Sequence, residues 1–137
     1  MKKIISTSEA PGAIGPYSQG VRVGSTIFYS GQIPLDPKTG QMVSGGVDEQ
    51  ARRVMENIGG LLRAEGLNYD NIVKTTIFLA DINDFQKVNE IYGSYFKQAP
   101  PARSTIQAGA LPKGARLEIE VIAVASEGDR TVADTSG

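Results

Sequence analysis

The sequence contains no cysteine, no histidine and no tryptophan. The missing cysteine and histidine exclude the usual zinc sites, disulfide frameworks, thiol nucleophiles and Ser-His-Asp triads. Any acid–base chemistry must then use aspartate, glutamate, tyrosine or lysine side chains. The protein classes that depend on a thiol or an imidazole are therefore excluded.

An excess of one charge and long apolar segments are also lacking. The chain has 14 Lys and Arg residues against 15 Asp and Glu residues, a formal net charge of −1, and a sequence pI near 5.4. This balance argues against nucleic acid and anionic membranes as partners. The first residues lack the apolar segment of a signal peptide, and no stretch approaches the roughly 20 apolar residues that span a bilayer. We expect a cytoplasmic protein that binds neither nucleic acid nor a membrane.

The 137 residues, of which 40% are hydrophobic, fit one domain with its own core. Residues 126–137 are small, polar and without periodicity, which is typical of a disordered segment. We therefore predict a single domain over residues 1–125 and a disordered tail over residues 126–137.

Hydrophobic periodicity and turn residues predict the order βββαβαββ. The predicted strands are residues 2–5, residues 20–29 folded as a hairpin about Gly24-Ser25, and residues 72–79, 102–108 and 116–124. The first predicted helix covers residues 47–65, with Gly66 as its C-terminal cap. The second begins at an N-terminal cap, Asp81 or Asn83, and ends before Pro100-Pro101. This order predicts an α+β sandwich, a mixed β-sheet with two helices packed on one face.

A sheet with helices on one face leaves its other face uncovered. Ile77, Leu79 and Ile119 are expected on that uncovered face, where they would meet solvent or a second subunit. Because a large exposed apolar patch is typical of an interface, we predict an oligomer.

The last two predicted strands carry a cluster of charged and polar residues. Strand alternation places three side chains of each on one face: Arg103, Thr105 and Gln107 on the first strand, and Arg116, Glu118 and Glu120 on the second. If the two strands are antiparallel neighbours, the cluster could be a solvated face with cross-strand ion pairs of about 0.2 to 1 kcal/mol each. It could instead be a site in which a guanidinium grips a carboxylate at two points and a nearby glutamate polarises a water molecule.

Six segments of the chain resemble the Rid/YjgF family of reactive intermediate deaminases in order and spacing. They are AIGPYSQG at residues 13–20, SGQIP at 30–34, KTT at 74–76, VN at 88–89, PARS at 101–104 and LEIE at 117–120. The resemblance covers roughly residues 2 to 124. It implies a chorismate-mutase-like α+β fold, a homotrimer with three clefts between subunits, and hydrolysis of 2-iminobutanoate and 2-iminopropanoate to 2-oxo acids and ammonia.

The resemblance also implies a role for particular residues. Arg103 would hold the carboxylate of the substrate, and Glu118 would activate or orient the attacking water. The further substrate-binding positions are Tyr17, Ser30, Gly31, Asn89 and Thr105, with Asn89 contributed by an adjacent subunit. The reaction requires no metal ion and no organic cofactor, and its partners would be a small 2-imino or 2-oxo acid and two further copies of the chain.

The chain departs from the family pattern near the site. Thr105 stands where many members carry cysteine, the segment at residues 97–100 is short, and Gln107 and Ala110 replace positions that are often charged. These changes leave a second interpretation open, a non-catalytic trimeric module that binds or senses a small molecule in the same clefts. Ribonuclease activity, which has been attached to some relatives, is disfavoured because the chain lacks a histidine base and a basic surface.

Overall fold

The computed structural model describes residues 1–125 of the chain. The predicted disordered tail, residues 126–137, lies outside the described residues. Within residues 1–125, no helix is long and apolar enough to cross a membrane.

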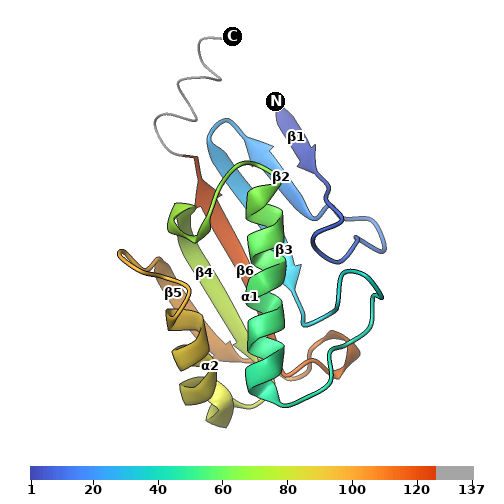
Figure 1. Cartoon of the computed structure of the whole chain (residues 1–137), viewed down its shortest axis with the longest axis vertical. Coiled ribbons are helices and arrows are strands. Elements are labelled where there is room, and N and C mark those ends of the chain that lie inside the picture. The colour runs from blue at the N-terminus through green and yellow to red at the C-terminus, as the bar shows by residue number, and fades with distance from the viewer. Residues whose placement is uncertain (126–137) are drawn as a thin grey trace.

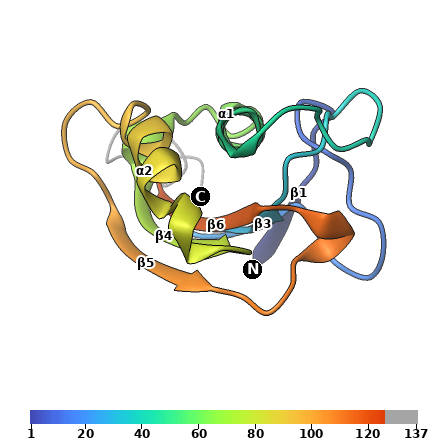
Figure 2. The ribbon, with the colours of Figure 1, turned by 90° about the horizontal axis from the view of Figure 1, so that it is seen from below.

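Six strands form one mixed sheet in the order β1-β2-β3-β6-β4-β5, and all neighbours are antiparallel except β4 and β5. The elements are β1 (Lys2–Ile5), β2 (Gly20–Val23), β3 (Thr26–Gln32), α1 (Val47–Arg63), β4 (Ile72–Leu79), α2 (Phe85–Gly93), β5 (Ala102–Gln107) and β6 (Leu117–Val124), with three short 3-10 turns, η1 (Tyr69–Asn71), η2 (Ile82–Asp84) and η3 (Pro112–Gly114). The helix α1 packs over the centre of the sheet and α2 over its β4–β5 end (Figure 1). Figure 2 shows both helices on one side, with no helix on the other. The predicted α+β class with two helices on one face is confirmed.

Both predicted helices form, and each ends earlier than expected. Gly66 has φ +72° and caps α1 as predicted, but the last helical residue is Arg63 rather than residue 65. The second helix ends at Gly93 and does not extend toward Pro100-Pro101. There the Ser94 hydroxyl donates to the carbonyl of Ile91 (2.6 Å) and satisfies a helix-end acceptor, so the chain can leave the helix at once.

The predicted pairing of the last two strands is wrong. Strand β5 is an edge strand that pairs in parallel with β4, while β6 lies between β3 and β4. A helix joins β4 to β5, and a strand–helix–strand connection places its two strands in parallel. The short loop after β5 therefore carries the chain across β4 and does not close a hairpin.

The face assigned to three apolar residues is also wrong. Ile77, Leu79 and Ile119 are 1%, 0% and 1% exposed, and they belong to the core beneath the helices. On the open face, Phe28 and Ile106 are about half exposed instead. The oligomer stays a prediction. The exposed apolar residues that support it are now Phe28 and Ile106, in place of the three buried ones.

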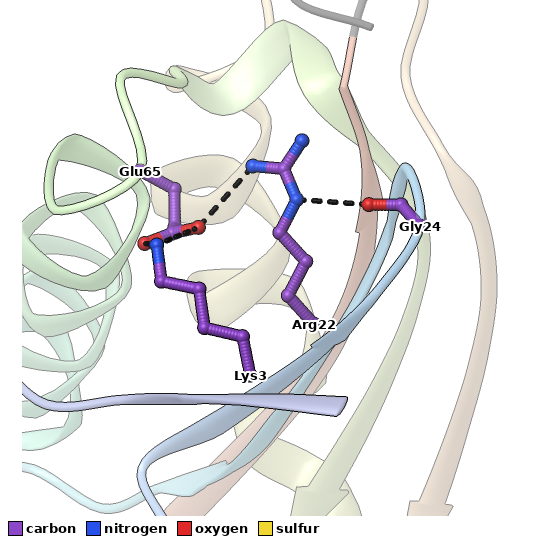
Figure 3. A network of polar contacts seen from close by, with 4 residues as sticks. All are labelled: Lys3, Arg22, Gly24 and Glu65. Atoms are coloured by element: carbon purple, nitrogen blue, oxygen red, sulfur yellow. Dashed lines mark hydrogen bonds and ion pairs between the residues drawn. The ribbon is translucent and has the colours of Figure 1, made fainter. Parts of the chain in front are cut away.

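A buried carboxylate fastens the start of the sheet to the end of α1 (Figure 3). The Glu65 side chain is 5% exposed and receives hydrogen bonds from Lys3 Nζ (3.0 Å) and Arg22 Nη1 (3.2 Å). The Nε of Arg22 also donates to the carbonyl of Gly24 in the β2–β3 turn (2.9 Å). Because two cations neutralise the carboxylate, the buried charge is tolerated and the β1–β2 edge stays under the helix.

Candidate active site

A cavity of about 540 Å³ lies against the sheet between the first Gly- and Pro-rich loop and strands β3 and β6. Four of the predicted site residues line it together: Tyr17, Ser30, Gly31 and Glu118. The Tyr17 side chain comes from the loop and is about half exposed, so it stands at the rim. Among the described lining residues, Glu118 is the one acidic side chain and Lys113 the one basic side chain, and most of the others are apolar.

Hydrogen bonds hold the loop against the end of β3. The Ser30 hydroxyl donates to the carbonyl of Ser18 (2.6 Å), and the Ser30 amide donates to the carbonyl of Gln19 (3.0 Å). The buried side chain of Gln19 spans the loop, accepting from the amide of Thr7 (2.7 Å) and donating to the carbonyl of Pro11 (2.8 Å). Gln19 lies in the segment AIGPYSQG that resembles the family, but no role was assigned to it, because the role depends on its burial and on its hydrogen bonds across the loop.

Gly31 and Glu118 are in direct contact. The register between β3 and β6 shifts between Tyr29 and Gln32, and this irregularity brings Gly31 under the glutamate. A Cβ atom on Gly31 would lie 2.9 Å from Cδ of Glu118, a distance that real Cβ contacts essentially never show, and 3.0 Å from its Cγ, which is tighter than most real contacts. The glutamate can therefore lie over β3 only because residue 31 has no side chain.

Burial raises the pKa of Glu118 above its ordinary value of 4.5, and the neighbouring carboxylate of Glu120 raises it further. Both effects disfavour the charged form. A carboxyl group whose pKa is raised is protonated more readily than an ordinary glutamate. Glu118 is therefore a candidate for general acid–base chemistry.

Replacing Gly31 with alanine should displace the Glu118 carboxylate and lower activity while the chain stays folded. A shift of about 1 Å in a catalytic group can reduce turnover about a hundredfold, and we expect a loss of that order in kcat. The matched control is Gly109→Ala, because a Cβ on Gly109 meets nothing within 4 Å. An unchanged kcat in Gly31→Ala, measured on protein with a wild-type circular dichroism spectrum, would contradict the role of this contact.

Arg103 lies on the opposite face of the sheet from Glu118. In the β4–β5 ladder Arg103 is opposite Thr75, whose side chain is buried under α2, whereas in the β4–β6 ladder Glu118 is opposite Phe78 on the open face. Paired residues share a face and neighbours along a strand alternate. The two side chains therefore cannot meet within one chain, and the alternative of cross-strand ion pairs between these two strands is wrong.

Arg103 is held by neutral groups. Its Nη1 donates to Oδ1 of Asn89 (2.6 Å), and its Cζ lies 5.4 Å from the ring centre of Phe85 and 5.3 Å from that of Tyr92. Among residues 1–125, no carboxylate forms an ion pair with Arg103. Its positive charge is thus left without a counter-charge in the described part of the chain.

A second cavity of about 450 Å³ adjoins this guanidinium and is lined by Ile82, Phe85, Arg103 and Thr105. The hydroxyl of Thr105 is buried and has no hydrogen-bond partner among the described residues. The predicted site residues therefore form two groups on opposite faces. Asn89, Arg103 and Thr105 make the first group, and Tyr17, Ser30, Gly31 and Glu118 make the second.

Within residues 1–125 there is also no group of three or more histidine, cysteine, aspartate or glutamate residues arranged to hold a metal ion. The chemistry available in the two cavities is that of the Glu118 carboxyl group, the Arg103 guanidinium, the Lys113 ammonium, hydroxyls, side-chain amides and backbone. These groups can bind an organic anion and move protons.

The fold and the two groups of residues define a small α+β domain with a carboxylate pocket on one face and, on the other, a guanidinium that neutral groups hold. The model of the family described as "Endoribonuclease L-PSP" matches residues 7–125, and the chain belongs to this family, the Rid/YjgF family that the sequence resembled.

Relatives and solved structures agree over nearly the whole chain. A human protein named "2-iminobutanoate/2-iminopropanoate deaminase" is 57% identical over 124 residues, which cover 90% of each chain. The crystal structure of YyfA, a Rid family protein from Yersinia pestis, superposes with a TM-score of 0.89 at 49% identity and covers 91% of this chain and 100% of that one. The structure of E. coli TdcF with bound serine has a TM-score of 0.86 at 49% identity and covers 90% of this chain and 99% of that one.

Proposed function

We propose that this protein is a hydrolytic deaminase that converts 2-iminobutanoate and 2-iminopropanoate to the corresponding 2-oxo acids and ammonia. The human relative bears the name of this activity at 57% identity. The structural observation that carries the proposal is Arg103, a guanidinium whose described partners are all neutral. TdcF was crystallised with serine. In serine, as in a 2-imino acid, the carbon that bears the nitrogen also bears the carboxylate.

The reaction adds one water molecule across a C=N bond. The imine enters protonated on nitrogen, as an iminium. The water oxygen bonds to C2, Glu118 takes one proton from that water, and the C=N electron pair moves to nitrogen, which gives a carbinolamine with a neutral amino group. Glu118 then returns its proton to this nitrogen, the C–N bond breaks as the hydroxyl oxygen forms the C=O bond and releases its proton to water, and a 2-oxo acid and ammonia leave. Only protons are transferred, so a positioned carboxyl group is sufficient, and no oxidant or reductant is consumed.

Arg103 supplies orientation. A guanidinium binds a carboxylate through two parallel hydrogen bonds, which fixes both the position and the rotation of a small acid. The unpartnered hydroxyl of Thr105, two residues along the same strand face, would donate a further hydrogen bond to the ligand. Holding C2 against the attacking water in this way can lower the barrier by several kcal/mol.

The opposite orientations of Arg103 and Glu118 support a site that two copies of the chain build together. We propose a homotrimer with a chorismate-mutase-like arrangement, in which each cleft takes Tyr17, Ser30, Gly31 and Glu118 from one copy and Asn89, Arg103 and Thr105 from the next. The half-exposed Phe28 and Ile106 on the open face support burial against another copy. The cytoplasmic location expected from the sequence remains part of this proposal.

The direct test generates 2-iminobutanoate in the cuvette with an amino-acid oxidase and follows the appearance of 2-oxobutanoate. We expect the purified protein to accelerate this hydrolysis and to have a mass in solution three times that of the 14.6 kDa chain. Binding of 2-oxobutanoate without acceleration would instead support the non-catalytic binding module. An active monomer would contradict the shared cleft.

A further inference from the structure

Helix α2 presents one continuous face to Arg103. Phe85, Asn89 and Tyr92 stand four and three residues apart, a spacing that places side chains on one side of a helix. The amide accepts a hydrogen bond from the guanidinium, and the two rings lie within 5.4 Å of its central carbon. Arg103 is therefore enclosed by α2 on its helix side, although its side chain starts from an exposed edge strand.

The Tyr92 ring is itself anchored by a buried hydroxyl pair. The oxygen atoms of Tyr92 and Thr75 are 2.7 Å apart, and the two residues are 4% and 1% exposed. Thr75 is also the β4 residue directly opposite Arg103 in the parallel ladder. The three residues are thus linked in a ring. Arg103 pairs with Thr75 in the strand ladder, and the Thr75 hydroxyl hydrogen-bonds the Tyr92 hydroxyl. The aromatic ring of Tyr92 in turn contacts the guanidinium of Arg103.

Core packing alone does not account for these two hydroxyls. Tyr92 packs against the ring of Phe96 at 4.8 Å between ring centres, and a phenylalanine would fill the same space. A valine would likewise fill the space of Thr75. Removing two hydroxyls from water costs free energy, and the one hydrogen bond between them does little more than offset that cost. The pair therefore adds little to the free energy of unfolding compared with a phenylalanine and a valine at the same positions. Burial also raises the pKa of Tyr92, which keeps the hydroxyl protonated and the bond to Thr75 intact.

We propose that Thr75 and Tyr92 are positioning residues that hold the Arg103 guanidinium in its ligand-binding orientation before the ligand arrives. The inference rests on the proposed function, in which Arg103 binds the carboxylate. A free arginine side chain loses rotamer freedom when it binds, and fixing it beforehand removes that loss from the binding step. A carboxylate partner would also fix the arginine, but it would compete with the ligand for the positive charge. Neutral rings fix it and leave the charge available.

The experiment compares Thr75→Val and Tyr92→Phe with the wild-type enzyme. Each change removes one hydroxyl and retains the shape of the side chain. We expect the KM for 2-iminobutanoate and the Kd for 2-oxobutanoate to rise about fivefold, with kcat within about twofold of wild type. Because both hydroxyls act through one bond, the double variant should raise KM no further than either single variant. NMR of the arginine Nε–H groups should show faster guanidinium rotation for Arg103, whose signal is assigned by its loss in Arg103→Lys.

Tyr69→Phe is the matched control. Its hydroxyl donates to the carbonyl of Met55 at 2.8 Å, so the variant also loses one tyrosine hydrogen bond, but Tyr69 does not contact Arg103. We expect a similar loss of thermal stability in Tyr69→Phe and an unchanged KM.

The outcomes separate the inference from the function on which it rests. An unchanged KM and Kd in Thr75→Val and Tyr92→Phe, while Arg103→Ala loses binding, would overturn the positioning role alone. A fall in kcat as large as the rise in KM would also overturn it, because the pair would then act on the chemical step or on folding. If Arg103→Ala itself binds 2-oxobutanoate like the wild type, the carboxylate anchor fails, and the positioning role fails with it.

Discussion

Replacing Arg103 with alanine should reduce kcat/KM for 2-iminobutanoate about a thousandfold. Each hydrogen bond between charged groups contributes about 1.5 to 3 kcal/mol, and the variant loses two of them together with the orientation they impose. The variant should also fail to bind 2-oxobutanoate in a calorimetric titration. Since Arg103 forms no ion pair with a described residue, its removal leaves no carboxylate of residues 1–125 unpaired, and the fold should keep its stability.

Two further variants make this result specific. Arg103→Lys keeps the positive charge but not the planar two-point grip, so it should recover only a small part of the activity. Arg52→Ala removes another arginine, one that pairs with Glu49 on the exposed side of α1, and should leave kcat/KM unchanged. An Arg103→Ala enzyme that keeps a tenth or more of the wild-type kcat/KM would show that the carboxylate is held elsewhere.

Periodicity predicted the elements well because the buried faces are regular. In α1 the apolar residues recur every three or four positions, and β4 occupies the predicted residues Ile72–Leu79. The ends of the helices were less predictable, because a side chain such as Ser94 can satisfy the last carbonyls at several positions.

Strand order was not predicted from the sequence. By sequence alone the last two strands could be antiparallel neighbours, but the helix between β4 and β5 makes those two strands a parallel pair, and the chain then crosses β4 to reach β6. Strand alternation likewise separated Ile77 from Phe78 but did not say which of them faces the helices. Both are apolar, so hydrophobicity alone leaves the assignment open.

The candidate site was predicted as a set of residues and not as an arrangement. Family resemblance selected Arg103 and Glu118, and the sheet places them on opposite faces, a result that depends on strand order and register. The supporting residues are harder still to find. Thr75 lies in the KTT segment that resembles the family, but nothing in the sequence assigns a role to its hydroxyl or to that of Tyr92, because threonine in a strand and tyrosine on a helix stripe are ordinary core residues.

Mixing two inactive variants should restore activity, because each site is proposed to draw on two copies of the chain. Glu118→Gln keeps the size of the side chain and removes its ability to move a proton, which should lower kcat by a factor of about 10² to 10⁴. In trimers assembled at random from equal amounts of Arg103→Ala and Glu118→Gln chains, about a quarter of the clefts combine an intact arginine from one copy with an intact glutamate from the next. We expect about a quarter of the wild-type activity.

The control for this complementation places both substitutions in one chain. A mixture of the double variant with Arg103→Ala contains no intact arginine, so it should stay inactive under the same co-refolding protocol.

The recovered activity of the first mixture should also show the wild-type pH profile. Since burial raises the pKa of Glu118, kcat/KM should fall on the acid side at a pH above the ordinary range of a glutamate, as the carboxylate that accepts the proton of water becomes protonated. If the mixture of single variants stays inactive although tagged chains prove that the subunits have exchanged, Arg103 and Glu118 act within one chain, and the sheet would have to rearrange to bring them to the same face.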